Sequence, residues 1–287
     1  MTELGNGARV MRHSEFREWA QANLGDSRQV YARDPRRPDD APLVYMPDGA
    51  ASQFYDDAKA GHLICPVPGC PSTELSTRGP KARRHHFFHV NAPPEAGHNR
   101  AYDRLVVERL LRDWAIGQRL SAGVLPNARL GGVPVTLLVH LTTRRHLALC
   151  YVDQRLGADD WLERHNTLTS YGVVDSWIFA PRPMFLAPPE PQPGPAEPEE
   201  GVVLDRAVFR RMRGNSTWPL IINAERQEVM NLVKPGGTPA RRLGLPAPYS
   251  RDRVLHAVVS PLSRCRLTEY GIATPAIGAG LLAFGRR

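Results

Sequence analysis

The stretch from Cys65 to His89, CPVPGCPSTELSTRGPKARRHHFFH, constrains the fold more than any other part of this sequence. Its two cysteines are separated by four residues, and this spacer contains Pro66, Pro68 and Gly69, which favour a turn. A turn can bring two thiolates to one point, and thiolate and imidazole are the ligands that a tetrahedral structural zinc prefers. Residues 41–97 are rich in loop signals and poor in core residues, so we expect a bound metal to supply much of their folding free energy.

Three histidines, His85, His86 and His89, follow the second cysteine and offer two ways to complete a Cys2His2 site. One pairs His85 with His89, and the other pairs His86 with His89. The competing interpretation is a pair of loop cysteines with solvated histidines beside the basic segment KARR. A catalytic zinc is the least favoured interpretation, because four good ligands leave no open coordination position.

The composition narrows the class of protein. Four cysteines in 287 residues are too few for a disulfide scaffold, and no apolar run approaches the roughly 20 residues of a membrane helix. The N-terminal residues lack the apolar segment of a signal peptide. We therefore expect a cytoplasmic protein without membrane contact. The net charge of +8 favours an anionic partner such as DNA, although an arginine-rich composition can supply part of that charge.

The clearest secondary-structure signal is an amphipathic helix that starts at His98, HNRAYDRLVVERLLRDWAIGQRL. Three strand-like runs follow: PVTLLVHL, HLALCYV and DSWIFA. Between the last two lies DDWLERHNTLTSYG, which fits a helix that ends at Gly172. A helix, a hairpin-like strand pair and a strand–helix–strand unit together predict a compact α/β core.

Composition shifts divide the chain into five parts. We expect an N-terminal extension over 1–40, a zinc-binding module over 41–97, the α/β core over 98–186, a proline-rich acidic linker over 187–201 and an additional α+β C-terminal domain over 202–287. Within the first part, HSEFREWAQAN predicts a short helix. Within the last, WPLIINAERQEVMNLV predicts two strands around a polar turn, and RDRVLHAVVSPLSRC predicts a helix.

Five features occur in order along the chain: ICPVPGC, HFFH (86–89), EAGH (95–98), the core from Ala101 to Ala180, and Arg164 followed by Gly172 and Trp177-Ile178. Together they resemble the competence protein CoiA-like family. The resemblance covers about residues 41–182. It implies a restriction-endonuclease-like fold of the PD-(D/E)xK type and a role in processing DNA during uptake, transfer or recombination. It also implies that the zinc ligands are Cys65, Cys70, His86 and His89.

The carboxylates that such a nuclease needs to hold Mg²⁺ are largely missing. The family's first strand carries Pro-Asp where this chain has Pro134-Val135. Its second strand carries Glu-x-Gln, which aligns with Cys150 and Val152, or with Val152 and Gln154 after a two-residue shift. No lysine occurs between residues 81 and 234. Any remaining Mg²⁺-dependent chemistry would have to use a displaced set of residues: Asp153, Gln154, Glu95 and His98.

A degenerate nuclease fold that still binds DNA is the favoured function, because binding phosphate requires arginines rather than carboxylates. Five arginines cluster in sequence around the zinc motif and the first core helix: Arg83, Arg84, Arg100, Arg104 and Arg112. The alternatives are an interaction scaffold that binds proteins without DNA contact, and a still-active Mg²⁺-dependent DNA nuclease. Cys150 could also be a nucleophile with His146 or His165 as base, but its apolar strand favours a buried core position.

Overall fold

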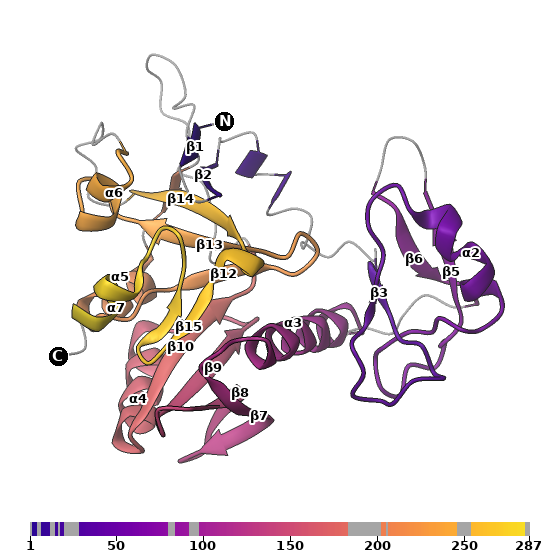
Figure 1. The fold of residues 1–287 in the computed structure, drawn as a ribbon, viewed down its shortest axis with the longest axis horizontal. Coiled ribbons are helices and arrows are strands. Elements are labelled where there is room, and N and C mark those ends of the chain that lie inside the picture. The colour runs from indigo at the N-terminus through magenta and orange to yellow at the C-terminus, as the bar shows by residue number, and fades with distance from the viewer. Residues whose placement is uncertain are drawn as a thin grey trace. The chain divides into compact units, whose positions relative to one another are not determined.

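The computed structural model describes residues 2–4, 7–11, 15–16, 18–19, 29–79, 84–91, 98–182, 202–204, 206–245 and 254–284. The chain divides into two compact units. We call residues 25–110 the small unit, and residues 1–24 with 111–287 the sheet unit. The predicted helix at His98 is confirmed as α3 (His98–Ile116), which begins in the small unit and ends in the sheet unit (Figure 1).

The small unit contains short elements joined by turns. β3 (Tyr31–Ala32) pairs with β4 (Val44–Tyr45), and β5 (Leu75–Arg78) pairs with β6 (His86–His89), both antiparallel. α2 (Ala51–Lys59) packs against β5. Two isolated bridges, Arg33 with Ile64 and Gln29 with Phe87, join the N-terminal segment of this unit to the rest.

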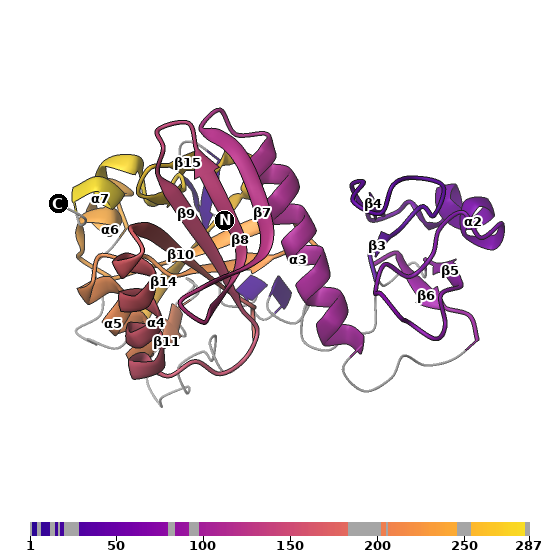
Figure 2. The same cartoon turned by 90° about the horizontal axis from the view of Figure 1, so that it is seen from below.

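The sheet unit is built on one sheet of ten strands, ordered β1-β2-β14-β13-β12-β10-β9-β8-β7, with β11 also pairing with β14 (Figures 1 and 2). The strands of the sheet are β1 (Thr2–Leu4), β2 (Ala8–Val10), β7 (Ser121–Leu130), β8 (Val133–Leu141), β9 (His146–Val152), β10 (Val173–Phe179), β11 (Val202–Leu204), β12 (Leu220–Asn223), β13 (Glu228–Val233) and β14 (Val254–Pro261). A separate hairpin joins β15 (Arg266–Thr268) to β16 (Gly271–Ala273), after the 3-10 turn η1 (Leu262–Arg264). The remaining helices are α4 (Ala158–Ser170), α5 (Ala207–Gly214), α6 (Thr238–Arg242) and α7 (Ala279–Phe284).

The predicted α/β class is confirmed, and so are its core elements. β8 and β9 form an antiparallel hairpin, and β9 continues through α4 into β10, which runs parallel to β9. Gly172, with φ at +71°, ends the turn after α4, as its sequence position predicted. β7 was not predicted, because Gly123 and Pro126 interrupt its pattern. It is an edge strand, where proline is tolerated.

The residues after the linker continue the same sheet, so they do not form the additional domain expected over 202–287. β12 lies parallel to β10, with Ile178 opposite Leu220, and the strand pair β12–β13 is confirmed. The helix predicted at 251–265 is wrong, because residues 254–261 form the interior strand β14. A strand buried on both faces is a continuous apolar run, which sequence periodicity does not distinguish from a buried helix.

Two hydrophobic clusters lie on opposite faces of the sheet, since neighbouring residues along β13 and β14 belong to different clusters. One cluster contains Leu232 and Val259 together with Trp161 of α4 and Phe209 of α5. The other cluster contains Val233 and Val258 together with Ala240 of α6 and Leu282 of α7. Helices therefore cover both faces of this sheet, with α4 and α5 on one of them (Figure 2).

Some expectations concern residues outside the described ranges, among them the linker 187–201 and the residues Arg83 and Glu95. Of the predicted N-terminal helix, residues 15–16 and 18–19 are described and are helical. Within the described parts of the chain, no helix combines the length and apolar character needed to cross a membrane.

Candidate metal centre

A closed turn holds the two cysteines at one point of the small unit. The Cys65 amide donates to the Thr73 carbonyl at 2.8 Å, and the Cys70 amide donates to the Val67 carbonyl at 3.2 Å. Gly69 has φ at +72°, a conformation that a residue without a side chain adopts readily. The Pro-Gly spacer therefore forms the turn that its sequence predicted.

Four side chains meet at this turn: Cys65, Cys70, His89 and His98. One ligand atom of each lies within 4.8 Å of all the others. The Cys65 sulfur is 3.2 Å from His98 Nε2, and the Cys70 sulfur is 3.5 Å from His89 Nε2. The two imidazole rings meet edge to face, with centroids 4.9 Å apart. One turn supplies both cysteines, β6 supplies His89 and the first residue of α3 supplies His98, so three segments of the chain converge.

This donor set fits a tetrahedral ion. With a Zn–S bond of about 2.3 Å and a Zn–N bond of about 2.0 Å, tetrahedral angles put sulfur and nitrogen about 3.5 Å apart. The Cys65–His98 and Cys70–His89 sulfur–nitrogen separations, 3.2 and 3.5 Å, lie close to that value. Cys65, Cys70 and His98 are buried and His89 is half-buried, which is typical of a closed site rather than one open to substrate.

The electrostatics of the cluster favour a bound cation. Burial raises the pKa of the Cys65 thiol to about 12, and the nearby Cys70 adds to the rise. Hydrogen bonds from the Val67 backbone and the Gln29 side chain oppose it. Burial also lowers the pKa of His89, with a further contribution from His98. Two thiolates can share this buried space only when a positive ion compensates them, and neutral imidazoles are the form that binds such an ion.

The fourth member of the cluster is His98, not His86 as the family resemblance implied. His86 and His89 are three residues apart on β6, and side chains on a strand alternate between its two faces. His86 is buried elsewhere, and its Nδ1 donates to the Arg84 carbonyl at 3.0 Å. His85 instead accepts the Ala51 amide at the start of α2, at 2.9 Å.

Of the four residues proposed for Mg²⁺ chemistry, Glu95 lies outside the described residues, and the other three have separate surroundings. His98 belongs to the cysteine cluster. Asp153 is buried directly after β9, whereas Gln154 is exposed. Among the described residues, Asp153 belongs to no group of three or more potential metal ligands.

The candidate DNA-binding arginines differ in their surroundings. Arg104 lies exposed on α3. Arg84 donates to the Tyr45 hydroxyl at 2.7 Å, with its guanidinium 5.8 Å from the centre of the Tyr45 ring. Arg100 is half-buried on α3. Arg112 is half-buried beside Asp113, at 3.4 Å. Arg104 is therefore the one of these four whose side chain is most open to a phosphate.

The alternative nucleophile, Cys150, is confirmed as a core residue at 3% exposure. Burial raises its pKa well above the ordinary value, and the charge of Asp175 adds to the rise. Asp175 itself is fully buried and accepts from His165 Nδ1 at 2.8 Å and from the Trp177 indole. The His165 ring stacks on Trp161, with centroids 4.9 Å apart. This cluster ties α4 to β10, and the thiol beside it is in its unreactive form.

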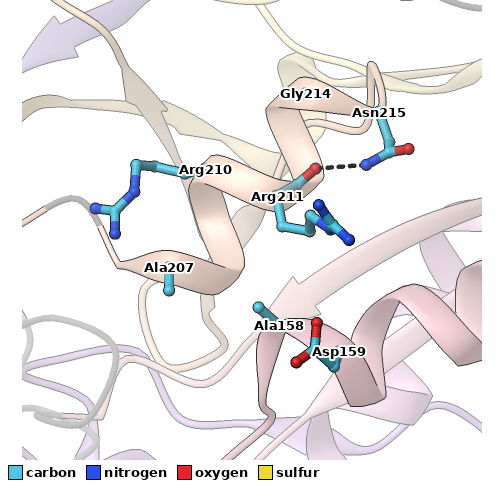
Figure 3. Close-up of a pocket in the computed structure, with 7 residues that line it drawn as sticks. All are labelled: Ala158, Asp159, Ala207, Arg210, Arg211, Gly214 and Asn215. Atoms are coloured by element: carbon cyan, nitrogen blue, oxygen red, sulfur yellow. Dashed lines mark hydrogen bonds between the residues drawn. The ribbon is translucent and has the colours of Figure 1, made fainter.

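A surface hollow lies in the sheet unit, between the first turn of α4 and one side of α5 (Figure 3). Its volume is about 630 Å³. Arg211 and Asp159 lie on facing walls, and the Asn215 amide donates to the Arg211 carbonyl at 2.8 Å. Six of its seven lining residues are exposed, so this hollow is open to solvent and holds no buried polar group. The cysteine–histidine cluster is the better-formed site.

The sequence matches no protein-family model and no curated protein sequence.

Proposed function

We propose that the small unit is a zinc-stabilised module in a CoiA-like protein, which binds DNA and has a nuclease-like core without its full set of catalytic carboxylates. The observation that carries this proposal is the convergence of Cys65, Cys70, His89 and His98. Four protein ligands fill a tetrahedral shell, so the ion would be structural. When bound, it would join the cysteine turn, β6 and the start of α3.

The order of elements supports the nuclease-like core. α3, the antiparallel strands β7, β8 and β9, the crossover helix α4 and the parallel strand β10 follow one another along the chain. These core strands carry few of the carboxylates that an active nuclease uses. Thr136 follows Val135 on β8, and its hydroxyl oxygen accepts the Tyr151 amide at 2.9 Å. Asp153 is the nearest carboxylate in sequence.

DNA is the proposed partner because of charge. The chain carries a net charge of +8, and Arg104 presents an exposed guanidinium on α3. Lysine and arginine side chains that neutralise phosphates release condensed counterions, so binding that uses them weakens as salt rises.

The test combines zinc quantification with DNA binding at several salt concentrations. We expect about one zinc per chain and an affinity for DNA that falls steeply with salt. Arg104→Gln should weaken binding to all sequences alike and lower the salt slope by about one. The matched control is Arg36→Gln, since exposed Arg36 already pairs with Asp34 at 2.9 Å. A chain that binds zinc but no DNA at low salt would replace the DNA proposal with the protein-scaffold alternative.

The same preparation tests the active-nuclease alternative. We expect no cleavage of single- or double-stranded DNA with Mg²⁺ or Mn²⁺, because a single carboxylate is a poor Mg²⁺ site. Cleavage that disappears in Asp153→Asn would instead make the chain an active nuclease with a displaced ligand set.

A further inference from the structure

The surface hollow between α4 and α5 has walls of opposite charge. α5 buries its apolar side chains in the core, which leaves Arg210 and Arg211 exposed on one wall. The first turn of α4 presents the exposed carboxylate of Asp159 on the other, and Figure 3 shows the Arg211 guanidinium on the side of α5 that faces it. Within the described chain, no ion pair joins Arg211 to Asp159, so both charged groups are available to a ligand.

Small side chains leave the space between these walls open. Ala158 lies on the α4 side, and Ala207 and Gly214 lie on the α5 side. A Cβ atom at Gly214 would meet no other atom within 4 Å. The volume of about 630 Å³ is that of an ordinary small-molecule site. Six of the seven lining residues are exposed, so the hollow can also admit one unit of a polymer that continues beyond it.

The two walls together select the chemistry of an occupant. A guanidinium binds phosphate oxygens, often through two parallel hydrogen bonds. An ionised carboxylate only accepts hydrogen bonds and repels phosphate, so Asp159 requires an N–H donor. A nucleotide whose base carries an amino group offers a phosphate at one end and such a donor at the other. Unpaired bases present these amino groups freely, whereas base pairing uses them in a duplex.

We propose that this hollow binds one nucleotide of single-stranded DNA, with its phosphate at Arg211 and the amino group of its base at Asp159. The positive charge of Arg210 on the same helix attracts the adjoining phosphate of the strand. None of the seven lining residues is aromatic, so binding here uses charge and hydrogen bonds in place of base stacking. This inference rests on the proposed DNA binding and adds a contact in the sheet unit.

The experiment measures the affinity of the full-length protein for fluorescent oligo-dC and oligo-dT at several salt concentrations. Cytosine has an amino group that donates to a carboxylate, whereas thymine has one N–H between two carbonyl oxygens that repel it. We expect the wild type to bind oligo-dC about tenfold more tightly, which is the effect of one hydrogen bond to a charged acceptor. Free deoxycytidine monophosphate should compete weakly, because it lacks the second phosphate of a strand.

Variants of the two walls should have different effects. Arg211→Gln should weaken binding of both oligonucleotides alike and lower the salt slope by about 0.7, the value for one phosphate contact on a single strand. Its fold should survive, because Asn215 bonds to the backbone carbonyl of Arg211. Asp159→Ala should remove the preference for oligo-dC without weakening the binding of oligo-dT, since a repelling charge is lost.

The matched control is Arg242→Gln, which removes an exposed arginine from α6 on the opposite face of the sheet. It should change neither the salt slope nor the preference for oligo-dC. Equal losses in Arg211→Gln and Arg242→Gln would overturn the inference, because they would show a diffuse effect of net charge.

Three further outcomes would overturn the inference alone: wild-type affinity in Arg211→Gln, an oligo-dC preference that is absent from the wild type or persists in Asp159→Ala, or a free nucleotide that binds as tightly as the oligonucleotide. A wild-type chain that binds no DNA at low salt would overturn the proposed DNA binding itself, which is a distinct failure.

Discussion

At the residue scale, the composition of the candidate centre follows from strand alternation. The two cysteines were identifiable as a pair because the Pro-Gly spacer between them predicts a turn. His89 and His86 could not both face them, since they lie an odd number of residues apart on β6. His98 fills the remaining position from the start of α3, although the sequence analysis placed it in a displaced Mg²⁺ site.

The ligand assignment predicts different results for two histidine variants. His98→Ala should lower zinc affinity by about a hundredfold or more, because four ligands share an apparent binding free energy of about 10–16 kcal/mol in zinc-finger peptides. His86→Ala should keep its zinc, since His86 bonds to the Arg84 carbonyl. The measurement is zinc retained per chain against increasing chelator. Zinc loss in His86→Ala with retention in His98→Ala would reverse the assignment.

At the element scale, segments with clear turn signals at their ends were predictable from the sequence, and β14 was not. α3 and α4 have apolar residues at helical spacing, and β8, β9 and β10 are short apolar runs between turn signals. β14 is buried on both faces, because Val258 and Val259 belong to hydrophobic clusters on opposite sides of the sheet. Its continuous apolar sequence therefore predicts a buried helix as readily as a strand. β7 lies at an edge, where a strand needs few apolar residues.

The hydrogen bond between His165 of α4 and Asp175 of β10 gives a prediction at this scale. His165→Leu should destabilise the sheet unit by roughly 3–5 kcal/mol, because it leaves the fully buried Asp175 carboxylate without its imidazole partner. Adding Asp175→Leu should recover much of that loss, since the double variant buries no unpaired charge. Urea unfolding of the two single variants and the double variant measures the coupling. Additive effects would show that the two side chains are energetically independent.

At the scale of the whole molecule, the two units differ in what stabilises them. The sheet unit has two extensive hydrophobic clusters, which draw on both its N-terminal and its C-terminal residues. Trp19, for example, donates to the Glu228 carboxylate of β13 at 2.8 Å. The small unit has short strands, and all four residues of the metal cluster belong to it. Its stability should therefore depend on metal far more than that of the sheet unit.

Metal removal should consequently unfold one unit selectively. After chelation we expect amide hydrogen exchange to accelerate over 29–79, 84–91 and 98–110, because a metal-dependent module loses its folding free energy with the ion. Strands β8, β9 and β13 should keep their protection. Exchange followed by mass spectrometry, with and without chelator, makes this comparison at peptide resolution. Uniform loss of protection across both units would mean that they unfold together, and no change would mean that the small unit folds without metal.

Local patterns in the sequence were enough to predict the α/β class, the amphipathic helices, the principal strands and the cysteine turn, because these depend on periodicity and on turn residues. The ligand set and the extent of the sheet could be read only from the folded structure. Those depend on which residues distant in sequence come together: His98 with Cys65, and Leu220 with Ile178. Such pairings follow from the packing of whole elements, which no local pattern encodes.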